Sequence, residues 1–196
     1  MKLLFATGNR GKVSEIKDLL AGSGWEVSTP ADSGMQFEVE EDGVTFEANA
    51  RKKAHVAHAA TGGWSLADDS GLEVDALGGM PGVQSARYAG PGAKDEDRYW
   101  KLLEELASVP DSERSARFRC VMCLVDPLEH EKVFSGICEG HIIHAPRGSS
   151  GFGYDPVFVP DGYEQTFAEL GLDVKNRISH RARAMAQVVR WLRDRG

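Results

Sequence analysis

The sequence predicts an α/β protein built around a mixed sheet. In the first half of the chain, short apolar strand candidates alternate with stretches of helical periodicity, which is typical of strand–helix–strand units. Two longer strand candidates follow in the second half with a short connection, which favours an antiparallel pair. A chain of 196 residues can bury one sizeable core, so we expect a single domain over residues 1–196.

The opening segment has the pattern of a strand, a turn and a helix. Residues 2–6 are apolar and short enough for a strand, and residues 7–11 form a polar, Gly-rich turn. A helix should follow, because four apolar side chains then recur on one helical face: Val13, Ile16, Leu19 and Leu20. A second strand is predicted over residues 25–28.

The next helix is predicted over residues 46–60, after the cap Thr45 and before the Gly-rich stop at 61–63. Residues 65–67 then form a short strand candidate that leads into Asp68-Asp69-Ser70-Gly71, and residues 72–75 alternate apolar with polar. This pattern places two adjacent acids at the end of a strand.

The remaining elements complete the mixed sheet. A loop over residues 78–82 precedes a helix with apolar residues at helical spacing: Tyr99, Leu102, Leu103 and Leu106. Strands are predicted over 116–125 and 132–143. A Gly-rich loop at 147–154, a short strand at 156–159, a capping box formed by Thr166 and Glu169, and a last helix over 179–195 follow.

Charge, hydropathy and cysteine content limit the partners and the compartment. The chain has 23 Lys and Arg against 30 Asp and Glu, a net charge of −7, which disfavours a nucleic-acid polymer as partner. The longest apolar run, residues 120–125, is far shorter than the ~20 residues of a membrane-spanning helix, and we expect neither a membrane segment nor a secretion signal. Three cysteines without such a signal indicate the reducing cytoplasm.

The spacing of Cys120 and Cys123 also fits a metal or redox pair. Both residues lie in a strand candidate, where side chains three positions apart point to opposite faces. We therefore expect buried structural thiols.

The turn over residues 7–12 is a candidate anion site. It joins a strand to a helix, where exposed backbone N–H groups and the positive end of the helix dipole attract phosphate. It differs from a P-loop, because only Asn9 and Arg10 separate Gly8 from Gly11, and Val13 follows Lys12. An ordinary tight turn is the alternative.

Cations open two of the predicted helices. Lys12 lies in the first turn of one helix, and His180 with Arg181 opens the last one. A positive charge at a helix N-terminus typically costs 0.3–1 kcal/mol. An anionic ligand between these helix ends would explain the pattern, whereas solvated basic residues are the alternative.

Acidic residues suggest a magnesium site. Asp68 and Asp69 are adjacent, and the loop before the second helix holds Glu38, Glu40, Glu41 and Asp42. Mg²⁺ prefers hard oxygen ligands and is commonly bound by one or two carboxylates together with substrate phosphates. If the strand continues through Asp68 and Asp69, one acid could hold the metal while the other faces a reacting water. A solvent-exposed acidic turn is the alternative.

Aromatic residues in the Gly-rich loop over residues 148–155 could stack on a base, and a hydrophobic plug beneath the loop is the alternative.

Two histidine pairs could be proposed as metal ligands, His55 with His58 and His141 with His144. Both pairs lack a matching third ligand, so they fit packing or surface roles better.

Six motifs in order resemble the inosine-triphosphate pyrophosphatase family. They extend over essentially the whole chain and comprise Thr7-Gly8-Asn9 with Lys12, Ala67-Asp68-Asp69-Ser70-Gly71-Leu72, Leu77-Gly78-Gly79 with Pro81-Gly82, Ser85-Ala86-Arg87-Tyr88, Gly151-Phe152-Gly153-Tyr154-Asp155-Pro156 and Ser179-His180-Arg181. The resemblance implies an elongated mixed sheet flanked by helices in two lobes with a central substrate cleft, and usually a homodimer. It also implies Mg²⁺-dependent hydrolysis of ITP, dITP and XTP to the monophosphate and pyrophosphate.

The resemblance also implies roles for individual residues. The triphosphate would be bound by Thr7, Gly8, Asn9, Arg10, Gly11 and Lys12, with Lys53 approaching from the second helix. Asp69 would accept the proton and Ser70 would contact substrate. The metal would be held by Glu41, Asp68 and Asp69, with Glu40 as the neighbouring alternative to Glu41. The base and sugar would be bound by Phe152, Gly153, Tyr154 and Asp155, and the base and phosphate contacts would be completed by Lys175, His180 and Arg181.

Two other classes of protein are weighed against this interpretation. A septum-associated nucleotide pyrophosphatase has a similar architecture but prefers other bases, and the motifs at 152–155 and 179–181 disfavour it. A nucleotide-binding module without catalysis is disfavoured by the presence of Asp68, Asp69 and Lys53.

Overall fold

The computed structural model describes residues 1–34 and 37–194 and contains a six-stranded sheet with the strand order β2-β1-β3-β4-β5-β6. The strands are β1 (Lys2–Phe5), β2 (Glu26–Ser28), β3 (Ser65–Val74), β4 (Ser115–Val125), β5 (Glu131–Ile142) and β6 (Phe158–Pro160). The helices are α1 (Arg10–Leu20), α2 (Phe46–Thr61), α3 (Asp95–Glu105), α4 (Phe167–Ile178) and α5 (His180–Arg193).

The sheet is mixed, as the sequence predicts. Strand β1 pairs in parallel with β2 and β3, and β5 pairs antiparallel with β6. In the β4–β5 pair, Asp126 N donates to His130 O while Ile142 N donates to Arg114 O. The residue numbers of the two pairs run in opposite directions, so β4 and β5 are antiparallel. The α/β class is confirmed.

The prediction of a strand end at Asp68 and Asp69 is wrong. Strand β3 runs without interruption from Ser65 to Val74, and both acids lie inside it. The sequence Asp-Asp-Ser-Gly favours a turn by local preference. The strand continues because its apolar residues are buried on either side of the acids, and because each acid is paired with a cation.

The predicted helix ends agree closely with the structure. Thr45 Oγ1 accepts a hydrogen bond from Ala48 N at 3.1 Å at the start of α2. Thr166 and Glu169 form the reciprocal capping box at the start of α4. The last helix begins at His180, directly after Ser179, and ends at Arg193, before the predicted end at residue 195, which itself lies outside the described residues.

The short strand β6 differs slightly from its prediction. A 3₁₀ turn over Asp155–Val157 occupies the first half of the predicted strand at 156–159, and the strand itself is Phe158–Pro160.

Contacts divide the chain into two compact units. The first unit contains Met1–Asp69, Cys120–Gly136 and Arg181–Gly196, and the second contains Ser70–Arg119 and Ile137–His180. Strands β3, β4 and β5 contribute residues to both units. Each unit has its own apolar cluster.

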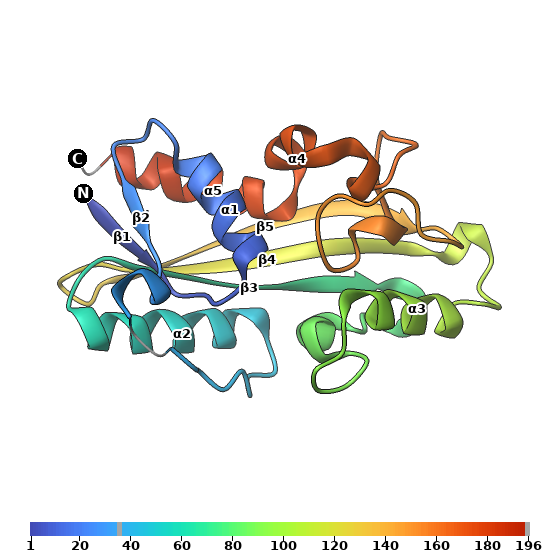
Figure 1. Ribbon diagram of the computed structural model, residues 1–196, viewed down its shortest axis with the longest axis horizontal. Helices are drawn as coiled ribbons and strands as arrows, with labels where there is room; N and C mark the ends of the chain where they lie inside the picture. Colours follow the sequence, from blue (N-terminus) through green and yellow to red (C-terminus); the bar gives the residue numbers. More distant parts are fainter. Residues whose placement is uncertain (35–36, 195–196) are drawn as a thin grey trace. The chain divides into compact units, whose positions relative to one another are not determined.

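In the first unit, α1 and α5 cover one face of the strands and α2 covers the other (Figure 1). The buried cluster joins Ile16 and Leu20 of α1 to residues of α5 and the strands, including Leu3, Phe5, Leu66, Met122, Leu124, Met185, Val188 and Leu192. Burial of this apolar surface positions the start of both helices over β3.

In the second unit, α3 and α4 lie on opposite sides of the sheet (Figure 1). The cluster contains the predicted helical face of α3 together with strand residues, including Tyr99, Leu102, Leu103, Leu106, Leu72, Val74, Phe118 and Phe158. The rings of Phe118 and Phe158 pack edge to face with centroids 4.7 Å apart.

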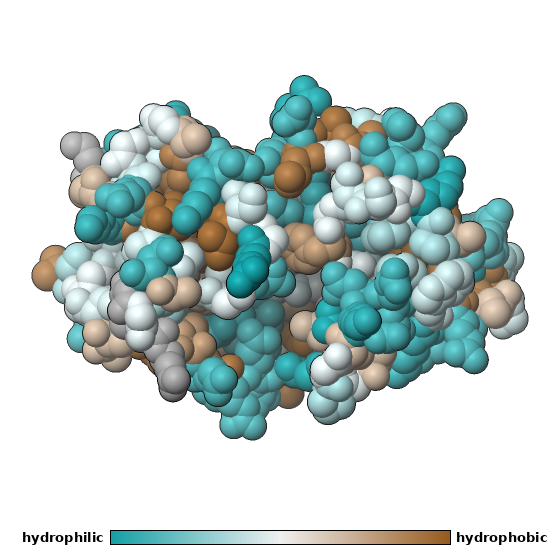
Figure 2. Space-filling view, viewed as in Figure 1, coloured by the Kyte–Doolittle hydropathy of each residue, from teal (hydrophilic) through white to brown (hydrophobic). Residues whose placement is uncertain are grey.

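Figure 2 shows mostly hydrophilic and neutral residues on one face of the molecule, with hydrophobic residues in small groups between them. Over the part of the chain that the structure describes, we find no helix with the length and apolar character needed to cross a membrane.

Candidate active site

The two acids of β3 point to opposite faces of the sheet, because successive side chains alternate along a strand. Asp68 faces α1 and α5, and Asp69 faces α2, as their contacts show. The sequence prediction that a continuing strand would separate the two carboxylates is thus confirmed. Each acid has a different set of partners.

Asp68 is fully buried and contacts two cations. Lys12 Nζ lies 3.0 Å from both carboxylate oxygens, and Arg181 Nη2 lies 3.3 Å from Oδ2. Arg181 also pairs through Nη1 with Glu15, which is equally buried. The cluster therefore balances two positive against two negative side chains.

This cluster explains the cations at the helix ends. Lys12 lies in the first turn of α1 and Arg181 in the first turn of α5, and both contact Asp68. The negative charge that these N-termini lack is thus supplied by a side chain of the protein itself.

The cations also determine the charge of Asp68. Burial alone would raise the pKa of its carboxyl, but Lys12, Arg181 and Lys53 together hold that pKa well below its usual range. Burial likewise opposes the charged form of Arg181, yet Glu15 and Asp68 raise its pKa above the ordinary value. Asp68 therefore stays ionised and holds the two cations in place.

Asp69 has a different environment. Its Oδ2 accepts a hydrogen bond from Asn49 Nδ2 at 2.8 Å, and its Oδ1 lies 3.8 Å from Lys53 Nζ. Burial raises the pKa of Asp69, and Lys53 and Asn49 reverse that rise only in part. A carboxylate with a raised pKa holds a proton more strongly than an ordinary one, as a general base must.

Lys53 connects Asp69 to the loop before α2 that carries Glu41. Its ammonium forms a hydrogen-bonded ion pair with Glu41 and also faces Asp69. Burial would lower the pKa of Lys53, but Asp68, Asp69 and Glu41 raise it overall, so the side chain is charged. The structure thus brings Glu41, Lys53 and Asp69 together, whereas Asp42, next to Glu41, pairs with the exposed Lys52.

The turn before α1 presents backbone to solvent. Asn9 caps the helix through Oδ1, which accepts from Lys12 N at 3.1 Å, and Asn9 N donates to Thr7 Oγ1 at 3.2 Å. Gly8 has open space around the position that a Cβ would take, and Arg10 is exposed. An exposed helix N-terminus of this kind can bind an anion through its N–H groups.

The Gly-rich loop of the second unit is held by a buried ion pair. Lys175 Nζ donates to Asp155 Oδ2 at 2.5 Å, and Phe152 N donates to the same oxygen at 3.0 Å. The Lys175 ammonium also lies 4.5 Å from the centroid of the Phe152 ring. A Cβ at Gly151 would lie only 2.1 Å from Asp155 Oδ2, so this close approach requires glycine.

The two aromatic residues of the loop differ in burial. Phe152 is half-buried, whereas Tyr154 is buried in the core of the second unit and its hydroxyl donates to Ser85 O at 2.9 Å. Gly153 N donates to Asp95 Oδ2 at 2.7 Å. Tyr154 therefore fits the alternative of a packed plug, and Phe152 is the ring suited to stacking.

His180 and Ser70 complete the predicted residues of the second unit. The His180 ring is buried and stacks on Phe118 with centroids 4.8 Å apart. Ser70 follows Asp69 on β3 and is half-buried.

The sequence interpretation missed Asn49 and Glu15, although helical spacing could have indicated both. Asn49 precedes Lys53 by four positions on α2, and Glu15 follows Lys12 by three on α1, so each shares a helix face with a predicted residue.

The three cysteines are buried, and His55 and His58 have partners within the protein. All three thiols are buried, and none forms a disulfide within the described ranges. Burial raises the pKa of Cys123 to about 11, which leaves it a protonated thiol. His55 contacts Glu131, and His58 contacts Gly63 O at 2.9 Å. The expectation of structural thiols is confirmed.

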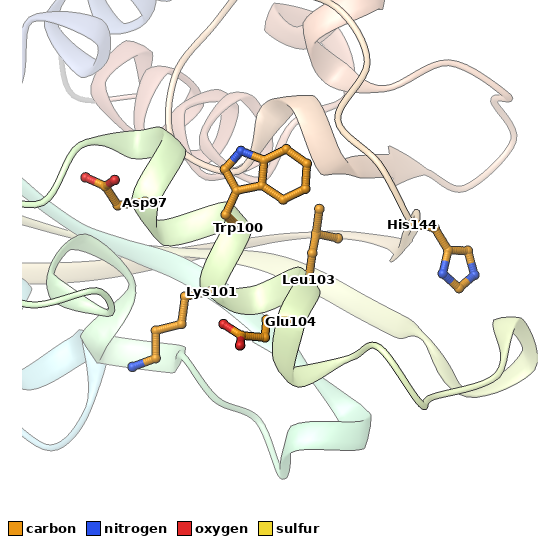
Figure 3. Close-up of a pocket in the computed structure, with 6 residues that line it drawn as sticks. All are labelled: Asp97, Trp100, Lys101, Leu103, Glu104 and His144. Atoms are coloured by element: carbon orange, nitrogen blue, oxygen red, sulfur yellow. The ribbon is translucent and has the colours of Figure 1, made fainter.

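A surface hollow of about 570 Å³ lies along α3, apart from the residues predicted for the site (Figure 3). It is lined by Asp97, Trp100, Lys101, Leu103, Glu104 and His144. None of these side chains is among the predicted functional residues, so we do not assign the candidate site to this hollow.

The donors near Lys53 fit a divalent cation. Glu41 and Asp69 each place a carboxylate oxygen near the Lys53 ammonium, so both acids face the same positively charged group. Mg²⁺ commonly takes one or two carboxylates and completes its shell with water and phosphate oxygens. Across residues 1–34 and 37–194, no group of three or more His, Cys, Asp or Glu is arranged to hold a metal ion.

An α/β fold with a buried carboxylate cluster beside an exposed helix N-terminus has the features of a phosphate-handling protein. The model of the Ham1 family matches residues 3–191, and the chain belongs to this family. A dITP/XTP pyrophosphatase of Opitutus terrae is 52% identical, with 97% of this chain and 98% of that protein covered. The dITP/XTP pyrophosphatase of Bacillus subtilis is 46% identical, with 96% of each covered. The structure of the Staphylococcus aureus Ham1 protein matches all of both chains at 38% identity and a TM-score of 0.89.

The relatives confirm the resemblance that the six motifs indicate. The solved structure, in turn, has the same mixed α/β fold over the full length of this chain. The chain is an enzyme of the pyrophosphatase type by this relationship.

Proposed function

We propose that this protein hydrolyses noncanonical purine nucleoside triphosphates, namely ITP, dITP and XTP, to the monophosphate and pyrophosphate. The relatives named dITP/XTP pyrophosphatase support the substrate class. The observation that carries the reaction is the pair on β3: Asp68 is fixed between two cations, whereas Asp69 combines a raised pKa with a position beside Lys53.

Residues of α1 and α2 are assigned the phosphate contacts in this proposal. The N-terminus of α1, residues 7–12, donates backbone N–H groups to the triphosphate, and Lys12 and Lys53 add positive charge. Arg181 supports phosphate binding indirectly. Its guanidinium contacts Asp68 and Glu15 and thereby holds the cluster around Lys12.

Asp69 is the proton acceptor. Attack at the α-phosphorus requires a water in line with the pyrophosphate leaving group and a base that takes its proton. Asp69 suits this role because Asn49 and Lys53 hold its two oxygens from different sides and burial strengthens its affinity for a proton.

Glu41 and Asp69 would hold Mg²⁺, whereas Asp68, on the opposite face of β3, would support the site indirectly. When bound, the ion neutralises charge on the phosphate oxygens. Asp68 contributes mainly by fixing Lys12 and Arg181, since both of its oxygens contact these cations.

The Gly-rich loop is assigned the base contacts in this proposal. Phe152 stacks on the purine. Donors from the 152–155 loop, Lys175 and His180 form hydrogen bonds with the group at the 6-position of the purine. An oxo group at that position accepts a hydrogen bond, whereas the amino group of adenine presents a donor and leaves a buried donor unpaired. Such a mismatch can discriminate by 10⁴-fold or more.

The proposed compartment and oligomeric state are those expected from the sequence. We place the enzyme in the cytoplasm, acting on free nucleotides as a homodimer. The net charge of −7 is poorly suited to nucleic acid, and the buried thiols suit a reducing compartment.

The direct test is a substrate panel of ITP, dITP, XTP, GTP and ATP, with chromatographic identification of the products. We expect kcat/KM for ITP, dITP and XTP to exceed that for ATP by at least 10³-fold. Binding without turnover would identify a nucleotide-binding module, and a preference for bases outside this set would favour the septum-associated type of pyrophosphatase.

A further inference from the structure

Asn49 is a buried amide that contacts two separate segments of the candidate site. Its Nδ2 donates to Asp69 Oδ2 at 2.8 Å. Its Oδ1 accepts from Gly43 N at 2.8 Å, and its Nδ2 also lies 3.4 Å from Gly43 O. The residue is only 1% exposed. One side chain therefore links the acid on β3 to the loop that carries Glu41.

The loop itself is fitted to this amide. A Cβ added at Gly43 would lie 2.5 Å from Asn49 Oδ1 and 3.0 Å from Ala48 Cβ. The first distance is too short for any side chain and the second is tight, so the loop approaches α2 this closely because residue 43 is glycine. The approach places Gly43 two residues after Glu41.

The spacing on α2 gives Asp69 two different partners. Asn49 and Lys53 are four residues apart and share one face of the helix, where the amide contacts Oδ2 and the ammonium faces Oδ1. An amide fixes the plane of a carboxylate without neutralising its charge. Lys53 alone, on a flexible stem, would restrain that plane much less.

We propose that Asn49 is the positioning residue of this site: it orients the Asp69 carboxylate and at the same time holds the Glu41 loop beside it. The inference rests on the proposed function, in which Asp69 accepts the proton and Glu41 binds the metal. Asn49 has no direct contact with substrate in this role.

Two substitutions test the two contacts of Asn49, with Asp69 and with Gly43, separately. Asn49→Asp keeps an acceptor for Gly43 N but replaces the donor to Asp69 by a second carboxylate. Gly43→Ala leaves the Asn49 amide chemically unchanged but forces the loop away from α2. Asn49→Asp should lower kcat for ITP about 100-fold with KM changed less than threefold, because a small misplacement of a catalytic group has an effect of this size. Gly43→Ala should raise the Mg²⁺ concentration for half-maximal rate at least fivefold.

An exchange of the two residues tests the contact without turnover. In EDTA, Asn49→Asp should lower the melting temperature, because two carboxylates then face each other. Adding Asp69→Asn restores a donor–acceptor pair in the opposite direction, so the double variant N49D/D69N should recover at least half of that loss while remaining inactive. A purely structural Asn49 predicts a further loss in the double variant.

These readouts distinguish the inference from the proposed function. If the wild type hydrolyses none of the panel, the proposed function fails, and recovery of melting temperature in the exchange still decides whether Asn49 orients Asp69. An active wild type whose Asn49→Asp variant keeps more than a third of kcat would overturn the inference. Asn49→Ser, which is uncharged and too short to reach Asp69, serves in the same kinetic test if Asn49→Asp does not fold.

Discussion

Replacement of Asp68 by Asn should strongly destabilise the protein. Asp68 contacts Lys12 at 3.0 Å and Arg181 at 3.3 Å, and the side chains of all three are 14% exposed or less. With Glu15, the cluster has no net charge; the substitution leaves one buried positive charge uncompensated. Breaking a buried ion pair by removing one partner typically costs about 3–5 kcal/mol. For a chain of this size, that corresponds to a melting temperature lowered by roughly 6–20 °C.

The assay is thermal unfolding in EDTA, followed by circular dichroism, with Asp42→Asn as the matched control. Asp42 also pairs with a lysine, Lys52, at 2.8 Å, but both side chains are exposed. Solvent screens such a pair, so the control should melt close to the wild type. A loss for Asp68→Asn no larger than the loss for Asp42→Asn would refute the description of Asp68 as the centre of the buried cluster.

The same variant has a defined pH dependence. The pKa of Asp68 is lower in the folded protein than in the unfolded chain, where it is near 3.9. Its stabilising contribution is therefore fully present above about pH 4 and is lost as the pH falls toward the folded pKa. The difference in melting temperature between wild type and Asp68→Asn should be constant from pH 5 to 7 and narrow below pH 4. A difference that grows below pH 4 would contradict this assignment.

Three further substitutions test the roles of other residues. Asp69→Asn should lower kcat at least 10²-fold with the melting temperature within about 3 °C of the wild type, because burial already disfavours the Asp69 charge; retention of a tenth of the turnover would reject Asp69 as base. Arg181→Ala should lower kcat/KM for ITP and ATP by the same factor within threefold, since Arg181 contacts Asp68 and Glu15; a tenfold change in the ratio would instead show that it reads the base. Phe152→Ala should raise KM for ITP about tenfold or more, as expected for loss of base stacking, and an unchanged KM would count against that contact.

Much of the fold could be predicted from the sequence because hydrophobic periodicity and capping residues act locally. The caps at Thr45 and Thr166, the face of α3 and the start of α5 at His180 are all found as expected. The interruption predicted at Asp68-Asp69 failed for the opposite reason. Its local composition favours a turn, but the strand is maintained by ion pairs with Lys12, Arg181 and Lys53, which are distant in sequence.

The candidate site, like the fold, could be predicted from the sequence only in part. The motifs indicated which acids and cations matter, but not their pairing. Arg181 was expected to help complete the base and phosphate contacts, and the structure adds that its guanidinium is buried between Asp68 and Glu15. The link between Asn49 and Gly43 was not foreseen, because it depends on a close loop-to-helix approach that only the folded backbone shows.

Hydrolysis of ITP in H₂¹⁸O, with mass analysis of the products, identifies the phosphorus atom that the water attacks. Attack on the α-phosphorus by water that Asp69 deprotonates predicts one ¹⁸O atom in inosine monophosphate and none in the pyrophosphate. Label in inorganic phosphate, with inosine diphosphate as the other product, would show attack at the γ-phosphorus and contradict the proposed reaction.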